Sequence, residues 1–203
     1  MPSLGRITWN YSLVHALFYP ALCAVISFAP VYLLAKGFSN AQYGILMGLS
    51  SGLVVFLQPT LAALADSSRR ADISRIILAV ISTAVLAILG LLLCSGNRLL
   101  TGFFYLLLAA STWVLVPLIN ALCVWFVNRG VPLNFGLSRG IGSLSFAVMS
   151  TLLGKIVAGV SEDILLYIAL VLLLSMGTAV FAMRVGKYDA PKTEFSAPDS
   201  RER

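Results

Sequence analysis

The sequence predicts an all-α membrane protein, a bundle of six transmembrane helices. Hydrophobic residues make up 59% of the 203 residues and charged residues 11%, and the mean hydropathy is +0.94. A soluble domain of this length does not need so many apolar residues to fill its core. They gather in six runs, each near the roughly 20 residues that a helix needs to cross the hydrocarbon, whereas strands of a membrane barrel would be about ten residues of alternating polarity.

The six runs predict six helices in a single transmembrane domain over 1–184. In order, the expected helices are about 10–35, 42–65, 73–94, 99–126, 134–158 and 164–183. The first run contains Pro20 and Pro30 and no small-residue cleavage site, so we do not expect a removable signal peptide. The short connections at 36–41 and 95–98 make neighbouring helices antiparallel. The polar residues 185–203 are expected to form a cytoplasmic tail or the start of a central linker.

The basic residues predict the orientation of the bundle in the membrane. If the N-terminus is cytoplasmic, only Lys36, Arg98 and Lys155 lie outside. The eleven inside are Arg6, Arg69, Arg70, Arg75, Arg129, Arg139, Arg184, Lys187, Lys192, Arg201 and Arg203. Because basic residues stay in cytoplasmic loops, we expect a multi-pass protein of the cytoplasmic (inner) membrane with both termini inside.

Other classes of protein are disfavoured by residue type and spacing. The cysteines, which have no paired spacing, predict neither a disulfide nor a metal site, and we expect no cofactor; they are Cys23, Cys94 and Cys123. Scattered basic residues do not predict nucleic-acid binding. Residues 48–52 match the Gly-x-Ser-x-Gly of serine hydrolases, which makes an intramembrane serine protease an alternative. This motif lies well inside the second helix, with His15 as the sole candidate base, so we expect no catalytic residue and no enzyme.

A burst of charge follows the second helix and contains Asp66, Arg69 and Arg70. The positive-inside rule accounts for the arginines, and a loop kept only for topology is one explanation of the segment. It does not account for Asp66. A carboxylate in the last turn of a helix costs a few tenths of a kcal/mol or more unless a cation or a helix N-terminus faces it. We therefore expect a positive group to face Asp66.

The segment "FLQPTLAALADSSRR" resembles the cytoplasmic loop signature of the major facilitator superfamily, Gly-x-x-x-Asp-(Arg/Lys)-x-Gly-(Arg/Lys)-(Arg/Lys). Asp66 and Arg70 match it, whereas Ala62, Ser67 and Arg69 depart from it. The segments "SFAPVYLLAKGFSNAQYGIL", "PLINAL" and "NFGLSRGIGSLSF" are similar to the branch that holds lactose permease. The resemblance implies one half of the superfamily fold, made of two inverted three-helix repeats, with Asp66, Arg69 and Arg70 as parts of a gate.

The resemblance also implies a second six-helix half, because superfamily members hold solute between two halves. We expect an N-terminal half of a secondary-active transporter that works by alternating access with a missing C-terminal half or another copy. The glycines at four-residue steps in the second helix let a helix approach closely, either within the bundle or at this seam; they are Gly44, Gly48 and Gly52. The expected partners are the lipid bilayer, a small polar or anionic solute and protons. A non-transporting truncated fragment or membrane scaffold is the alternative.

Polar residues within the spans are the candidate solute-binding residues. Arg139 and Asn120 are expected about 8 and 10 Å from the cytoplasmic ends of their helices. In the related sugar permeases the matching pair is Glu and Arg with a stacking Trp; here Asn120 replaces the Glu and Phe146 replaces the Trp. These departures put sugar binding in doubt, and an arginine that faces Asn keeps a net positive charge suited to a carboxylate or phosphate. Alternatively, Arg139 snorkels to the cytoplasm. All acidic residues lie at or beyond the membrane surface, so a coupling proton would need His15 or the other half; Gln58 and Trp113 are secondary candidates.

Overall fold

The computed structural model describes residues 4–67, 73–94, 96–128, 130 and 133–183, with the side chains of 4–6 and 61–67 outside the description. The elements are α1 (Leu4–Leu22), a short π-helix η1 (Cys23–Ser27), α2 (Ala29–Ala35), α3 (Asn40–Ser67), α4 (Ile73–Leu93), α5 (Arg98–Val127), α6 (Phe135–Gly159) and α7 (Ile164–Ala182). Six helical segments are long and apolar enough to cross a membrane: Ile7–Ser27, Asn40–Thr60, Ile73–Leu93, Arg98–Val127, Phe135–Gly159 and Ile164–Ala182. The predicted six-helix, all-α membrane fold is confirmed.

The first membrane crossing is broken near its far end. The sequence predicts one run over 10–35, but helix α1 begins already at Leu4 and passes through η1 into α2, with Phe28 between them at φ −96° and ψ 8°. Pro30 lies in the first turn of α2, and proline cannot donate the backbone hydrogen bond that would continue a helix from the preceding turn. Before Pro30 the helix widens into the π-turn η1, where Phe28 N donates to the carbonyl of Cys23 at 3.2 Å.

Side chains fix the starts of three helices. Ser39 and Gln42 form a reciprocal capping box before α3, with Gln42 N 3.2 Å from Ser39 Oγ and Ser39 N 2.9 Å from Gln42 Oε1. Asn97 accepts from the backbone N–H of Leu99 at the start of α5, and Asn134 accepts from Leu137 N at the start of α6. These caps satisfy donors that a helix start leaves unpaired, so the helices begin at fixed residues.

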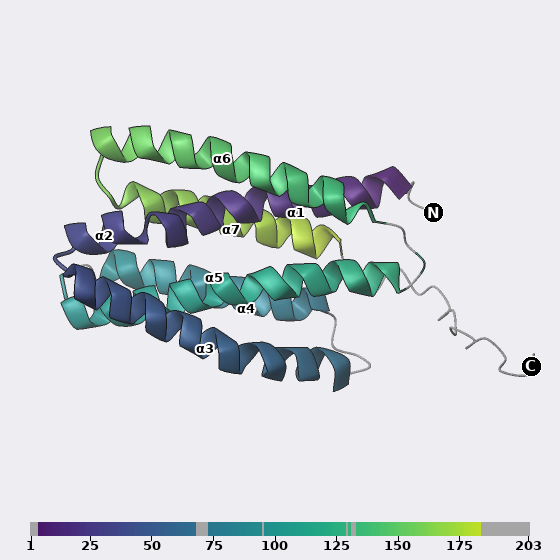
Figure 1. Cartoon of the computed structure of the whole chain (residues 1–203), viewed down its shortest axis with the longest axis horizontal. Helices are drawn as coiled ribbons and strands as arrows, with labels where there is room; N and C mark the ends of the chain where they lie inside the picture. Colours follow the sequence, from purple (N-terminus) through teal and green to yellow (C-terminus); the bar gives the residue numbers. More distant parts are fainter. Residues whose placement is uncertain (1–3, 68–72, 95, 129, 131–132, 184–203) are drawn as a thin grey trace, which may run out of the picture.

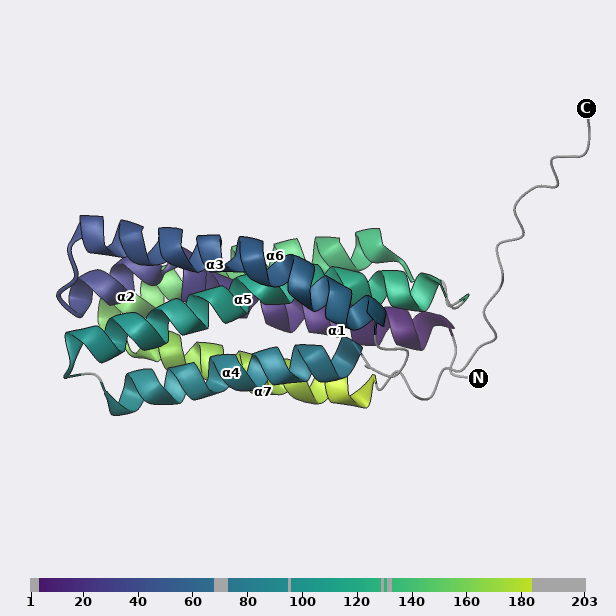
Figure 2. The ribbon, with the colours of Figure 1, turned by 90° about the horizontal axis from the view of Figure 1, so that it is seen from below.

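Helices α1 and α5 form the centre of the bundle. The buried share of the apolar span is 61% for α5 and 56% for α1, compared with 11% for α3 and for α6. Helix α1 packs on α6 and α7, and α5 packs on α3 and α4. Figure 1 shows α6 and α3 at opposite edges of the bundle with α1 and α5 between them. Figure 2 shows α3 and α6 along one side and α4 and α7 along the other. We call the side that carries α3 and α6 the open face.

Ionic and aromatic contacts tie together the loops at the end of the bundle opposite the N-terminus. Lys36 Nζ lies 3.0 Å from Glu162 Oε1 and 2.8 Å from Asp163 Oδ1, which joins the α2–α3 loop to the α6–α7 loop. The Arg98 guanidinium lies over the Phe38 ring, 5.7 Å from its centroid, and adds the start of α5. Gly37 has φ +83°, a conformation that favours glycine, and a Cβ there would lie 2.8 Å from an Arg98 nitrogen. Short loops thus hold antiparallel helices in register.

A candidate solute site between α1 and α6

An aromatic and imidazole stripe lies on one side of α1. Tyr11, His15 and Tyr19 follow each other at four-residue steps, which places them on one face of a helix. The His15 ring centroid is 4.7 Å from that of Tyr11 and 5.7 Å from that of Tyr19. All three side chains are buried. Phe135, the first residue of α6, meets the same imidazole edge-on at 6.2 Å.

Helix α6 lies against this stripe at close range. Ser12 and Ser138 share a hydrogen bond of 2.8 Å between their hydroxyls, which puts these residues at the same level of the bundle. One turn further along α6, a Cβ on Gly142 would lie 2.5 Å from Cδ2 of Tyr19 and 3.3 Å from Cβ of His15. No real Cβ makes a contact as short as the first. The absence of a side chain at residue 142 therefore lets the Tyr19 ring lie directly on the α6 backbone.

Arg139 contacts Tyr19, the last residue of the same stripe. Its guanidinium donates a hydrogen bond to the Tyr19 hydroxyl and lies over the Tyr19 ring, 5.0 Å from the centroid. Because the ring lies at the level of Gly142, one turn beyond Arg139, the side chain extends along α6 away from the start of the helix. The arginine is nevertheless exposed on the isolated bundle. Among the described residues, the ion pairs involve Lys36 and not Arg139.

Asn120 lies at a similar level on the other side of α1. The Tyr11 hydroxyl donates to the carbonyl of Ile119, at 3.0 Å, and Ile119 precedes Asn120. Since Ser12 is bonded to Ser138, the two neighbours on α1 fix both Asn120 on α5 and Arg139 on α6 at the same depth. The structure shows no contact between Asn120 and Arg139 among the described residues, and α1 packs between their helices.

The other candidate residues are distributed around this cluster. Phe146 lies seven residues after Arg139, on the same face of α6, and packs partly buried against the core. Gln58 is exposed on α3, and no described contact brings it to Arg139. Trp113 is partly buried on α5, away from the described contacts of the stripe. The structure therefore brings His15 and Arg139 together around Tyr19, and leaves Gln58 and Trp113 apart.

Two buried nitrogen-bearing side chains keep hydrogen-bonding capacity. His15 is 1% exposed, and neither of its ring nitrogens has a hydrogen-bond partner within the described chain; the indole nitrogen of Trp113 also has none. Leaving a buried polar group unpaired costs about 1–3 kcal/mol. A neutral imidazole offers one donor and one acceptor. Within the stripe next to Arg139, His15 thus retains both ring nitrogens for a further partner.

The gating residues predicted from the charge burst cannot be placed. Asp66 lies in the last turn of α3 with its side chain outside the described part of the chain, and Arg69 and Arg70 lie outside the described residues altogether. The glycine strip of α3 is described. At Gly44, Gly48 and Gly52, no atom outside the local helix lies within 4 Å of the point where a Cβ would be. No described helix of this bundle packs against the strip.

The hydroxyl of Ser50, the serine of the Gly-x-Ser-x-Gly stretch, is hydrogen-bonded within its own helix. Ser50 is fully buried within α3, and its hydroxyl donates to the carbonyl of Leu46 at 2.6 Å. A nucleophile elbow needs a sharp strand-to-helix turn and a histidine within hydrogen-bond reach. Ser50 lies instead in the middle of a helix, and the nitrogens of His15 have no bond to it or to any other described residue. This geometry gives the protease alternative no support.

Sequence reasoning missed two contributors to the site, Tyr19 and Gly142. The four-residue spacing of Tyr11, His15 and Tyr19 is a signal for a shared face, and it could have added Tyr19 to the candidates. Nothing in the sequence signals that this face meets α6 at Gly142, because facing helices are chosen by tertiary packing.

The six apolar spans define a multi-pass membrane protein, and their arrangement is consistent with one six-helix half of a transporter fold. The sequence matches the family described as MFS_1 like over residues 8–202. Since this match covers nearly the whole chain, the protein belongs to the MFS_1 like family of the major facilitator superfamily, whose members are membrane transporters. Searches of curated proteins and of solved structures found no significant match.

Proposed function

We propose that the chain is half of a secondary-active transporter for a small polar or anionic organic solute, coupled to protons, and that it works by alternating access with a second six-helix half. The proposal rests on the surroundings of Arg139. It is exposed on the isolated bundle, contacts Tyr19, and has no carboxylate partner within the described residues. An intramembrane cation costs at least about 2.5 kcal/mol unless water, a partner or a ligand compensates it.

The surroundings of Arg139 favour an anionic group over a neutral sugar. The guanidinium presents a planar fork of donors that matches a carboxylate or phosphate, and one position of this fork is directed to Tyr19. Phe146, further along the same face of α6, offers a flat apolar surface for the remainder of a solute. Asn120 lies at the same depth on α5, across α1 from Arg139, and is the candidate neutral hydrogen-bonding group on that side. We assign the coupling proton to His15 or to a carboxylate of the second half, since the acidic residues of the sequence lie outside the spans.

The test is uptake into proteoliposomes by the assembled transporter. A panel of labelled carboxylates, organic phosphates and neutral polyols is offered, and Arg139→Lys and Arg139→Ala are compared with the parent chain. We expect uptake of an anionic member, a strong loss with alanine, and a smaller loss with lysine because it keeps the charge without the fork. Normal uptake by both variants would mean that Arg139 serves only to orient its helix in the membrane. Uptake by a purified six-helix monomer would contradict the need for a second half.

A further inference from the structure

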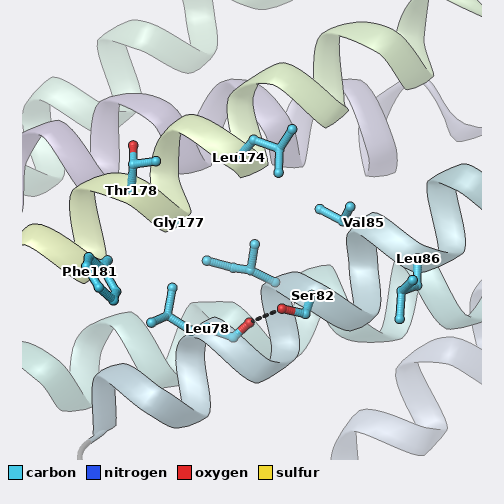
Figure 3. A pocket seen from close by; sticks show the side chains of 9 residues that line it. Leu78, Ser82, Val85, Leu86, Leu174, Gly177, Thr178 and Phe181 are labelled. Carbon is cyan, nitrogen blue, oxygen red and sulfur yellow. Dashed lines mark hydrogen bonds between the residues drawn. The ribbon is translucent and has the colours of Figure 1, made fainter.

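A long apolar groove lies between α4 and α7, on the side away from the open face. It has a volume of about 500 Å³ and is lined by residues within 78–86 of α4 and 174–181 of α7. Figure 3 shows side chains of Leu78, Val85 and Leu86 on one wall and those of Leu174 and Phe181 on the other. The groove follows the helix axes for more than two turns, so it suits an elongated occupant.

The groove lacks hydrogen-bonding groups for a polar solute. Its two hydroxyls are already used within their own helices: Ser82 Oγ donates to the carbonyl of Leu78 at 2.9 Å, and Thr178 Oγ1 to that of Ser175 at 2.7 Å. The other lining residues are aliphatic, aromatic or glycine. A polar molecule would lose its hydration here without replacement, whereas an alkyl chain would lose nothing.

Gly177 keeps the groove open. A Cβ there would lie 3.7 Å from Cγ2 of Ile81 and 3.8 Å from Cδ2 of Leu78, which is ordinary van der Waals contact. A larger side chain at residue 177 would therefore be tolerated by the backbone and would fill the space. The helices that form the groove are also the most apolar of the six spans, with hydropathies of 2.9 for α4 and 2.5 for α7. Their outer surface is suited to lipid.

A cation lies in line with the groove at one end. Arg75 is exposed in the first turn of α4. It lies within about 20° of both Ser82 and Leu86 around the helix axis, at one edge of the α4 face that lines the groove. It precedes Leu78 by about 4.5 Å along the axis. Among the described residues, no acidic side chain lines the groove. The arrangement is a basic group at the end of the span followed by an apolar track into the hydrocarbon.

We propose that this groove binds one acyl chain of an anionic phospholipid and that Arg75 binds its phosphate. The lipid belongs to the leaflet at the end of the bundle where α4 begins. The charge decides the lipid class, because a zwitterionic headgroup would bring a cation of its own beside Arg75, whereas an anionic headgroup adds only the charge that the guanidinium attracts. The proposal depends on the membrane topology and not on the identity of the transported solute.

The test uses the full chain in phosphatidylcholine vesicles that contain a small fraction of phosphatidylglycerol with a photoreactive acyl chain. After illumination, the adducts are mapped by mass spectrometry of peptides. We expect adducts within 78–86 and 174–181. Gly177→Leu should abolish them. Gly154→Leu places the same side chain on α6, at a glycine with nothing within 4 Å of a Cβ position, and should leave them unchanged. Arg75→Gln should lower the yield about fivefold, whereas Lys155→Gln, which removes an exposed charge from α6, should not.

The proposal is overturned if adducts are absent from the groove, if both leucine variants behave alike, or if photoreactive phosphatidylcholine labels the groove as well as phosphatidylglycerol does. Cross-links from the groove to another copy of the chain would identify a protein interface instead. The apparent melting temperature of each variant verifies folding. Should Gly177→Leu fail to fold, Leu86→Trp fills the groove from the opposite wall at a residue that is already 65% exposed.

Discussion

The ring of Tyr19 occupies the place where a side chain at residue 142 would lie. A Cβ on Gly142 would come within 2.5 Å of the Tyr19 ring, so α1 and α6 can approach this closely only with glycine at that position. The contact also determines where the Tyr19 hydroxyl lies, and this hydroxyl accepts the hydrogen bond from Arg139. The packing of two helices thereby sets the position of the intramembrane cation.

Alanine at residue 142 is expected to destabilise the bundle, whereas alanine at residue 140 is not. Gly142→Ala forces the Tyr19 ring or the α6 backbone to shift, and overpacking of this kind costs about 1–3 kcal/mol. Gly140 has nothing within 4 Å of a Cβ position, so Gly140→Ala should be neutral or stabilising by up to about 1 kcal/mol through helix propensity. The measurement is the apparent melting temperature of both variants in nanodiscs. Equal melting temperatures would mean that α1 and α6 do not touch at this point.

The six membrane spans could be predicted from the sequence because bilayer thickness imposes a length that apolar runs reveal directly. The break in the first span could be foreseen only in part. Pro30 signals a missing donor, but whether the chain kinks, bulges or ends there depends on the packing of the surrounding helices. The similar depth of Asn120 and Arg139 also followed from the sequence, because rise per residue is constant in a helix.

The partner of Arg139 could not be predicted. Tyr19 is separated from it by 120 residues, and periodicity says which residues share a face but not which helix that face meets. The same limit applies to Lys36, which the predicted topology placed outside without indicating a partner. Its ion pairs with Glu162 and Asp163 depend on the α2–α3 and α6–α7 loops lying side by side, a property of the three-dimensional order of helices.

Stability should depend on pH through the Lys36 ion pairs. Burial lowers the pKa of Lys36, but its hydrogen bonds to Asp163 and Glu162 outweigh burial and raise the pKa above the ordinary 10.5. Its contribution is therefore fully present below pH 10.5 and is lost as pH rises through the higher folded value. A hydrogen bond from its own backbone, followed by that from Lys36, lowers the pKa of Glu162 below the ordinary 4.5. Its contribution is present above pH 4.5 and is lost as pH falls through the lower folded value.

Lys36→Gln should remove the part of this dependence that comes from the ion pairs, while the backbone hydrogen bond of Glu162 remains. Because the pairs are partly exposed to solvent, we expect a loss of about 1 kcal/mol at neutral pH and a smaller difference from the parent chain in acid and in strong base. Lys155→Gln removes an exposed cation from α6 and serves as the control. Melting temperatures measured across the pH range provide the comparison. A constant difference between Lys36→Gln and the parent at every pH would show that the loop contact is not ionic.

Three loops are expected on one side of the membrane and the end of α5 on the other. In a chain whose native cysteines are replaced by serine, Ser39→Cys, Gly96→Cys and Ser161→Cys should react alike with an impermeant thiol reagent added outside cells. Asn128→Cys, near the opposite end of the bundle, should react only after permeabilisation. All four positions are exposed, so access and not burial decides the result. The direction follows from the positive-inside rule, and the reverse pattern would invert the assigned orientation.

The glycine strip of α3 is expected to form the seam with the second half. Gly48 has nothing within 4 Å of a Cβ position, so Gly48→Trp should leave the six-helix bundle folded while blocking the close helix approach that such strips permit. Val171→Trp places the same side chain on α7, on the opposite side of the bundle, at a residue that is 63% exposed. The tagged chain is extracted from its membrane in mild detergent, and the size of its complex is measured. We expect Gly48→Trp to shift the chain to a smaller species and Val171→Trp to leave the complex intact, because only the first side chain lies where the second half would pack. If the complex with Gly48→Trp keeps its size, the glycine strip does not lie at the seam with the second half.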